Sequence, residues 1–327
     1  MMARRATLLA LGLGVIVAAP TSGWSEETAD QTETETPPGS ARLKYSVWGA
    51  AKESLFGDPY SHPERWRPMT LGTFFTEGWT DPWISPPKGG GGAPRQSWLN
   101  AFNGVFYRLV STTGGWAHGD GGDAYSGSLT VDTPLNARTQ LQWTIPYVAS
   151  NLGAHGDRDT GFGDFSLTTR FLLSETRDVS QSFNIAFRAP TGDPANGNHV
   201  ASIEPDYEFW ANWWRGFVVR GGVGMTVPIN HEGFSTTSRA SFLGNLAAGY
   251  YFTPHDLAPV GDLVWYVSTN LSTLTDNRGP NTTTLSFTPG FRTYLGWNLY
   301  LFGGVEVPVT EPKPFDYQVL GELLMPF

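Results

Sequence analysis

The last thirteen residues, 315–327, constrain the fold of this chain more than any other stretch. Every odd-numbered position among them is aromatic, aliphatic or glycine, and the sequence stops at Phe327. A period of two places these side chains on one face of a strand. A last strand with one apolar face and a final aromatic residue is typical of bacterial outer-membrane β-barrels. The pattern therefore predicts an all-β fold, a transmembrane antiparallel up-and-down barrel. Its expected partners are outer-membrane lipid and the barrel-assembly machinery, which would read Leu323, Met325 and Phe327.

The first 25 residues predict a signal peptide. Arg4 and Arg5 precede an apolar run from Ala6 to Ala19, which has the length of an export signal and is too short to span a membrane comfortably. Small residues suit cleavage after Gly23 or after residue 25. The expected location of the exported chain is therefore the cell outer membrane.

Composition excludes several classes of protein. The chain has no cysteine, which excludes a lipid anchor on cysteine and a disulfide framework. Removing Arg4 and Arg5 from 21 Lys and Arg leaves 19 basic residues against 30 acidic ones, a formal net charge of −11. Nucleic acid is therefore not an expected partner. No later apolar run is long enough for a membrane helix. A soluble β-sandwich or propeller stays an alternative.

Twelve alternating segments follow residue 96, and each can supply the roughly 9–11 residues that a tilted membrane strand needs. In the clearest of them Phe183, Ile185 and Phe187 alternate with Ser182 and Asn184. In this strand and in the similar 161–174 and 216–230, odd positions are therefore expected to face lipid and even positions the lumen. A count of ten or fourteen stays open, because the first segment is the least regular. The predicted strands are 97–111, 123–134, 137–149, 161–174, 180–191, 201–214, 216–230, 239–253, 261–274, 282–296, 297–309 and 315–327.

The connections between these segments alternate in length. Tight turns are predicted at 135–136, 215 and 297–298, and longer Gly, Asp and Asn-rich links at 112–122, 150–160, 191–200, 230–238 and 275–281. Bacterial barrels have short periplasmic turns and longer outer loops. The alternation therefore predicts that both ends of the barrel chain are periplasmic.

Four prolines fall late in strands that run outward, each at an even position: Pro146, Pro190, Pro228 and Pro308. Proline donates no ladder hydrogen bond and belongs at strand ends or bulges. We interpret the four as a lumen-side ring near the outer mouth, although unrelated prolines would give the same count.

Even-numbered positions place charges of both signs in the expected lumen. One interpretation is a polar channel, in which an acidic strand faces arginines and orients solutes. The alternative is that the charges pair across the lumen and close it. The candidate lumen residues are Arg170, Arg188, Glu204, Asp206, Glu208, Arg220, Arg292 and Glu306.

Two short motifs carry a family resemblance. Residues 160–165, Thr-Gly-Phe-Gly-Asp-Phe, open one predicted strand, and 189–193, Ala-Pro-Thr-Gly-Asp, close the next. Together they resemble the outer-membrane barrels associated with meta-pathway phenol degradation, over about residues 100–327. The resemblance implies a barrel that passes small, often hydrophobic organic molecules, and it implies no catalytic residue.

The segment before the predicted barrel divides in two. Residues 26–42 are acidic and nearly devoid of apolar side chains, which predicts a disordered linker. Residues 43–96 contain many aromatic residues, which must bury against something. This arm is expected either to enter the barrel as a plug or to pack below its periplasmic rim.

Catalysis and metal binding are weakly indicated. No Gly-x-Ser-x-Gly or His-Glu-x-x-His pattern occurs, so no catalytic residue, metal or cofactor is predicted. The Asp-rich stretches after His118 and His155 could supply Ca²⁺ ligands, but Asp and Gly are ordinary turn residues. The sequence predicts an outer-membrane channel or transporter for small organic molecules, hydrophobic and aromatic ones among them. The alternatives are a plugged structural or adhesive barrel and, less favoured, a barrel hydrolase.

Overall fold

The computed structural model describes residues 45–120, 122–152, 158–193, 196–197, 200–229, 239–275 and 282–327. The predicted signal peptide and the linker 26–42 lie outside these residues. So do the stretch around His155 and most of the predicted links 230–238 and 275–281. Within the described chain, no helix combines the length and the apolar character that crossing a bilayer requires.

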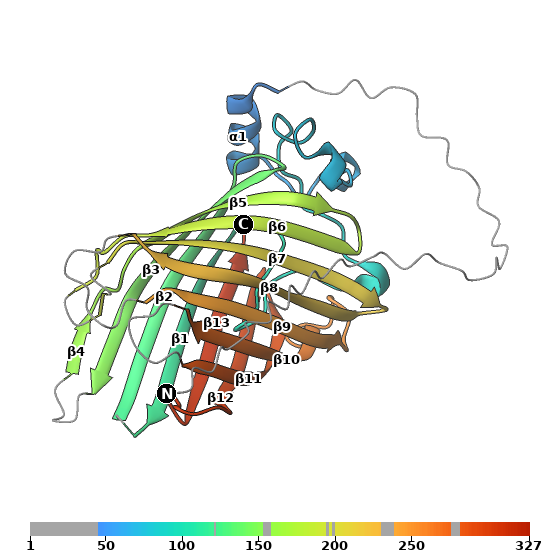
Figure 1. The fold of residues 1–327 in the computed structure, drawn as a ribbon. Coiled ribbons are helices and arrows are strands. Elements are labelled where there is room, and N and C mark those ends of the chain that lie inside the picture. Colours follow the sequence, from blue (N-terminus) through green and yellow to red (C-terminus); the bar gives the residue numbers. More distant parts are fainter. Residues whose placement is uncertain are drawn as a thin grey trace, which may run out of the picture. The chain divides into compact units, whose positions relative to one another are not determined.

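Twelve antiparallel strands close into a barrel (Figure 1). Each strand pairs with its neighbours in the chain, and the first pairs with the last from Leu109 opposite Pro326 to His118 opposite Tyr317. A thirteenth, short strand, β4 (Arg158–Gly161), pairs only with β3. The barrel strands are β1 (Leu109–Gly119), β2 (Gly122–Pro134), β3 (Thr139–Leu152), β5 (Ser166–Glu175), β6 (Val179–Arg188), β7 (Ser202–Trp214), β8 (Phe217–Pro228), β9 (Ser241–Tyr251), β10 (Gly261–Leu274), β11 (Thr283–Gly296), β12 (Leu299–Pro308) and β13 (Tyr317–Pro326).

The alternation of side chains matches the two faces of the barrel wall. In β8, Val223, Met225 and Val227 are 41–48% exposed on the outside, whereas Val218 and Arg220 are fully buried on the inside. The same parity holds in β6, where three apolar odd residues are exposed and Ser182 and Asn184 are buried. An apolar outer band around a polar interior is the arrangement of a membrane barrel. The predicted fold class and strand number are confirmed, as is the facing in β6 and β8, whereas in β1 and β9 the odd positions face the lumen, as the buried Ser111 and Ala247 show.

The two ends of the barrel differ in their connections. We call the end that carries 135–138, 176–178, 215–216, 252–260 and 297–298 the short-turn end, and the other the loop end. One of the two-residue turns at this end has Trp297 at φ +52° and Asn298 at φ +59°, the left-handed pair that matches the twist of a two-residue hairpin. Both Leu109 and Pro326 lie at the short-turn end, opposite each other in the sheet.

The first strand does not lie where the sequence predicted it. The predicted strand 97–111 is wrong except for its last three residues, and the predicted long link 112–122 is β1 together with a tight turn. The backbone of 97–108 is bonded by side chains instead of a neighbouring strand: Leu99 N donates to the Tyr266 hydroxyl and Phe102 N to Asn245 Oδ1. Gly104 has φ +64°, which interrupts an extended strand.

The N-terminal arm precedes the barrel with little regular structure. Helix α1 (Val47–Phe56) begins at Ser46, whose hydroxyl accepts from Gly49 N at 3.0 Å, the usual bond of an N-cap residue. Three short 3₁₀ turns follow, η1 (Pro63–Arg65), η2 (Leu71–Thr73) and η3 (Gly90–Gly92). Helices this short are not stable on their own in water, so the arm depends on contacts with the rest of the chain for its structure.

Candidate permeation pathway

Residues 93–108, which we call the plug segment, lie inside the barrel. Ala93, Val105 and Phe106 are fully buried, and Trp98 and Tyr107 belong to one apolar cluster with inward residues of β7, β8, β9, β10, β12 and β13. A segment surrounded by the inner faces of strands on all sides occupies the lumen. Burial also raises the pKa of the Tyr107 hydroxyl.

The apex of the plug segment is held at mid-barrel. Asn100, at φ +50°, donates from Nδ2 to Thr288 Oγ1 at 3.1 Å and to Glu306 Oε2 at 2.6 Å. Its carbonyl oxygen accepts from Asn245 Nδ2 at 2.9 Å and from the Ser268 hydroxyl. Four strands, β9 to β12, therefore fix one residue, which allows a non-glycine residue to keep a left-handed backbone.

The descending half of the plug segment contacts the opposite wall. Gly104 N donates to Glu208 Oε2 at 2.9 Å, and Gly104 O accepts from the Ser180 hydroxyl at 2.7 Å. The Tyr107 carbonyl accepts from Gln140 Nε2 at 2.7 Å. A Cβ on Gly104 would lie 2.5 Å from the backbone of Phe209. Glycine is required here by the close approach of the plug to β7 and by the positive φ.

Below the apex, a layer of arginine and aromatic rings fills the lumen. The fully buried Arg220 guanidinium lies 4.5 Å from the ring centroid of Trp98 and donates from Nη2 to the carbonyls of Arg95 and Gln96. Trp98 also stacks on Tyr266, with centroids 4.8 Å apart. A desolvated cation on an indole face is a strong contact, so Arg220 holds this part of the plug segment against β8.

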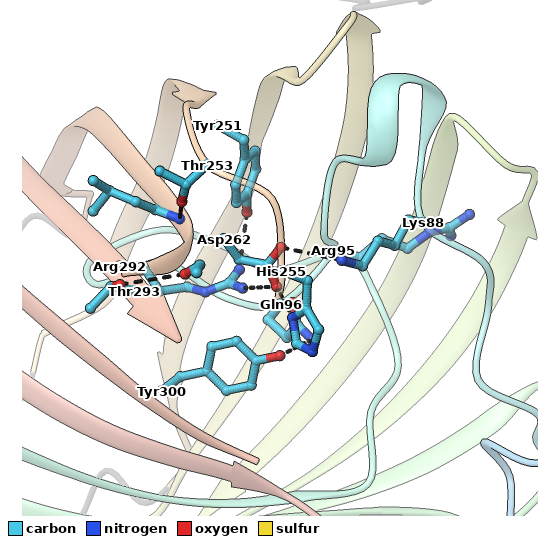
Figure 2. Close-up of polar contacts among 12 residues, drawn as sticks. Lys88, Arg95, Gln96, Tyr251, Thr253, His255, Asp262, Arg292, Thr293 and Tyr300 are labelled. Carbon is cyan, nitrogen blue, oxygen red and sulfur yellow. Dashed lines mark hydrogen bonds and ion pairs between the residues drawn. The ribbon is translucent and has the colours of Figure 1, made fainter. Parts of the chain in front are cut away.

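A polar cluster joins this layer to the β9–β10 connection (Figure 2). Asp262, at φ +47° and 2% exposed, pairs with His255 Nδ1 at 2.6 Å and with Lys88 Nζ at 3.2 Å. Arg292 lies 3.8 Å from the same carboxylate and donates to the Tyr251 hydroxyl at 3.0 Å. Since Tyr251 also accepts from Trp98, the cluster ties the arm and the plug to one wall.

The arm is clamped onto the turns of the short-turn end. The Arg95 guanidinium pairs with Glu175 at 3.2 Å, both side chains being at most 2% exposed, and it also donates to the carbonyls of Thr176 and Arg177. Glu175 accepts from Trp66 Nε1 at 2.9 Å, and its backbone forms a bridge with Met69.

A second clamp lies at the β2–β3 turn. The guanidinium of Arg138, which is fully buried, donates to Glu77 O in the arm and to Leu172 O and Leu173 O in β5. Burial lowers the pKa of this guanidinium. Residues 45–92 therefore lie against the turns while 93–108 enter the lumen. Of the predicted arm 43–96, only the last four residues belong to the plug segment, and the rest of that segment lies in the predicted first strand.

Arg108 connects the arm to the seam of the barrel. Its Nη1 donates to the carbonyls of Ser54, Leu55 and Gly57 at the end of α1. Its Nε donates to Phe327 O, and its guanidinium lies over the Phe327 ring. One side chain thus links helix α1, the start of β1 and the last residue of the chain.

Alongside the plug segment and on the loop side of its apex, the lumen is hollow. A cavity of about 450 Å³ is lined by Ala101 and Phe102 of the plug and by inward residues of β1, β2, β3, β5, β6, β7 and β13. A second cavity of about 420 Å³ shares Phe102 with the first and reaches Glu306. A third, of about 340 Å³, shares Arg188 and Thr144 with the first and contains Pro146. We call the three together the vestibule.

The predicted lumen residues all lie on inward positions, and most are paired. Arg170 pairs with Glu208 at 2.7 Å and Arg188 with Glu204 at 2.8 Å. Asp206 accepts from Asn184, and Glu306 from Asn100. Arg220 and Arg292 contact the plug layer and not the vestibule. Their roles in permeation remain predictions, as does the role of Leu323, Met325 and Phe327 in assembly.

The four prolines predicted to form a ring at the outer mouth differ in their surroundings, and the ring stays a prediction. Pro228 and Pro308 are buried and end β8 and β12, as a residue without an N–H should. Pro190 follows β6 and is exposed. Pro146 lies within β3, next to a register shift opposite Gly127 and Ser128, because a bulge tolerates the missing donor.

Sequence reasoning missed the plug segment itself. Its signal was the mixed parity of 97–111, in which Phe102 and Phe106 fall out of step with the odd apolar positions. A second signal was Gly222, which leaves room on β8 for the Phe102 ring. That signal can be recognised only with the structure.

The described residues contain no group of three His, Asp or Glu side chains placed to hold a metal ion. The three histidines among them, His62, His118 and His255, each bond a carboxylate. None of these three has a serine nucleophile among its hydrogen-bond partners in the described part of the chain.

Comparison with known proteins agrees with the fold. A family model described as "Putative MetA-pathway of phenol degradation" matches residues 89–311. The chain belongs to this family. The match includes the whole plug segment and every barrel strand from β1 to β12, and it ends before β13. No curated protein sequence matches the chain.

Solved structures were also compared with the chain. It is similar to the COG4313 outer membrane channel from Pseudomonas putida F1, with 13% identity, a TM-score of 0.54, and coverage of 71% of this chain and 100% of that one. It also matches a KdgM porin (8% identity, TM-score 0.45, 67% and 99% covered) and the CymD monoaromatic hydrocarbon channel (8%, 0.39, 73% and 96%). Fold and family together identify an outer-membrane β-barrel.

Proposed function

We propose that this protein is an outer-membrane channel for small organic molecules whose passage is controlled by the plug segment. The observation that carries the proposal is the division of the lumen at Phe102. On one side lies a vestibule large enough for a small solute, and on the other a packed layer of plug and wall. Membership of a family named for phenol degradation and similarity to a barrel described as a channel support this function.

The vestibule suits molecules that combine an apolar body with a polar group. Phe102, Leu109 and Leu324 give it apolar surface, and Thr and Asn side chains alternate with charged ones around the rest. Binding sites for small molecules share this mixture of apolar lining and few placed polar groups. Hydrophobic and aromatic compounds of about one ring are the expected cargo.

Movement of the plug can be tested with cysteines, since the chain has none of its own. The side chains of Asn100 and Thr288 are in contact, with Nδ2 and Oγ1 3.1 Å apart. A variant with Asn100→Cys and Thr288→Cys would lock the apex to β11 when oxidised. Planar-bilayer conductance and flux of aromatic solutes into liposomes would be recorded before and after addition of a reductant, with each single variant as control.

A channel with a mobile plug should pass solutes only after reduction. A second variant, in which a Gly/Ser linker of equal length replaces residues 97–104, should conduct without any reductant. A folded barrel that passes nothing in either form would overturn the proposal and favour a structural barrel. That second function is supported by the dense clamps at Arg95 and Arg138, which would suit a permanent closure.

The orientation of the channel follows from its ends. Short turns and both barrel termini lie together, and we propose that this end is periplasmic and that the loop end faces the outside. The vestibule would then face the medium, with the plug below it. We also propose that the terminal residues Leu323, Met325 and Phe327 act as the recognition signal for the assembly machinery.

A further inference from the structure

Acidic side chains outnumber basic ones in the vestibule. Its described lining contains seven carboxylates and two guanidinium groups, those of Arg170 and Arg188. The carboxylates are Asp132, Asp164, Glu204, Asp206, Glu208, Glu306 and Glu322. Six of the seven lie on strands of the wall, and Asp164 lies in the link between β4 and β5.

Both arginines already form ion pairs with carboxylates of the vestibule. Arg170 Nη2 is bonded to Glu208 and Arg188 Nη2 to Glu204. Two guanidinium groups cannot neutralise seven carboxylates, so most of the negative charge in the described lining has no arginine partner.

Two carboxylates of the main cavity are hydrogen-bonded by neutral groups, and a third, Glu322, lines the same cavity. Asp132 accepts from Gln142 Nε2 at 2.9 Å, and Asp206 accepts from Asn184 Nδ2 at 2.5 Å. Asp132 is 3% exposed. A carboxylate in such a place is expensive unless a positive charge or a strong donor comes near. A solute entering the vestibule can supply either.

We infer that the vestibule selects small cations, organic ammonium ions included, over anions, and that Asp132, Asp206 and Glu322 determine this selectivity. The inference rests on the proposed channel function and adds its charge preference. A pore lined by carboxylates attracts cations and repels anions, because the low-dielectric wall focuses the field into the lumen. The apolar surface of Phe102 and Leu324 would accommodate the hydrocarbon part of an organic cation, whereas an aromatic carboxylate would face repulsion.

The first test is ion selectivity. The reversal potential would be measured across a KCl gradient for the wild-type chain and for the triple variant Asp132→Asn, Asp206→Asn, Glu322→Gln, each also carrying the linker in place of 97–104 so that current flows. We expect a K⁺ over Cl⁻ permeability ratio of roughly five or more, falling toward one in the triple variant. The matched control is Glu311→Gln, an exposed loop carboxylate outside the vestibule, which should leave the ratio unchanged.

The second test needs no current, because the vestibule lies outside the plug. Saturation-transfer NMR on the full chain in detergent would compare benzylammonium with benzoate, two probes of similar size and opposite charge. Benzylammonium should bind at least several-fold better, and the triple variant should remove the difference. A far-UV circular dichroism spectrum and heat-modifiable migration would show that the variant is folded.

The possible outcomes distinguish a failure of the charge selectivity from a failure of the proposed channel function. Current without cation preference, or a preference that survives in the triple variant, would overturn the selectivity while the channel stands. If no form conducts, the channel fails, and the NMR comparison alone decides whether the vestibule discriminates charge. Equal binding of the two probes would then overturn the inference as well.

Discussion

The two halves of the lumen are built from the same strands, but one half is packed with side chains and the other is hollow. Toward the short-turn end, inward positions carry Arg220, Tyr251, Tyr266 and Tyr300, and they pack against the plug with almost no exposure. Toward the loop end, and beside the plug as far as Leu109 and Leu324, inward positions carry mostly polar and charged residues without aromatic rings, and the lumen stays hollow. A barrel wall of constant circumference thus becomes a closed or an open compartment according to the size of its inward side chains and the presence of one added segment.

The two ends also differ in how deeply their ion pairs are buried. Arg95 and Glu175 at the short-turn end are almost completely buried, whereas Arg188 at the loop end is 33% exposed in its side chain. Burial makes each partner depend on the other, because an uncompensated charge away from water is costly. Charge removal should therefore have unequal effects at the two ends.

The largest effect is expected from breaking the buried pair. Arg95→Ala leaves Glu175 without its partner and leaves the carbonyls of Thr176 and Arg177 without a donor. Loss of one partner of a buried pair costs about 3–5 kcal/mol. We expect the plug segment to become sensitive to protease added from the short-turn side, with the barrel itself intact by heat-modifiable migration.

The companion variant Glu175→Gln sharpens this result. It keeps the shape of the side chain and an oxygen for Trp66 Nε1 to donate to, but it removes the charge opposite Arg95. A plug that is equally protected in wild type and in both variants would mean that the clamp contributes little to closure.

A second prediction compares two glycines of the same left-handed backbone. A Cβ added to Gly104, at φ +64°, would meet the Phe209 backbone at 2.5 Å, whereas one added to Gly92, at φ +82°, would have no described heavy atom within 4 Å. Gly92→Ala should cost about 1–2 kcal/mol for the backbone alone. Gly104→Ala should cost more, because β7 must also move, and should raise open-channel conductance where Gly92→Ala does not. Equal unfolding midpoints in urea for the two variants would contradict the close packing of the plug.

The strands of the barrel wall could be predicted from the sequence far better than the plug segment that lies inside them. Strands such as β6 and β8 alternate cleanly because lipid and lumen impose a period of two on every residue. The plug obeys no such period, since its residues are fixed one at a time by side chains from many strands, as Asn100 is by Asn245 and Thr288. Contacts between residues more than a hundred positions apart leave no local pattern.

The lumen residues show the same limit. Inward positions such as Arg170 and Arg220 follow from parity, but their partners do not. Parity cannot tell that Arg170 bonds Glu208 in the vestibule whereas Arg220 lies over Trp98 in the closed layer. The side of the apex on which a charge lies decides its role, and the apex was not predicted.

A third prediction concerns the seam. Arg108→Ala removes the donors to Ser54, Leu55 and Gly57 and to Phe327 O. Each lost bond from a charged donor contributes about 1.5–3 kcal/mol, and contacts of α1 such as that of Glu53 with Arg65 lie within the arm itself. The helix should therefore detach while the barrel stays closed. Hydrogen exchange should rise in 47–57 and not in β13. Arg67→Ala, which removes bonds within the exposed part of the arm, is the matched control, and increased exchange in both variants would show that Arg108 has no special part.

The smallest effect is expected at the loop end. Arg188→Gln breaks the pair with Glu204, but both groups remain partly open to the vestibule, and a solvated pair is worth about 1 kcal/mol or less. The thermal midpoint should therefore hardly change. Cation preference should instead increase, because one of only two positive groups in the described lining of the vestibule is lost. A large loss of stability with unchanged selectivity would erase the contrast between the two halves, since it would mean that charges at the loop end support the fold as those at the short-turn end do.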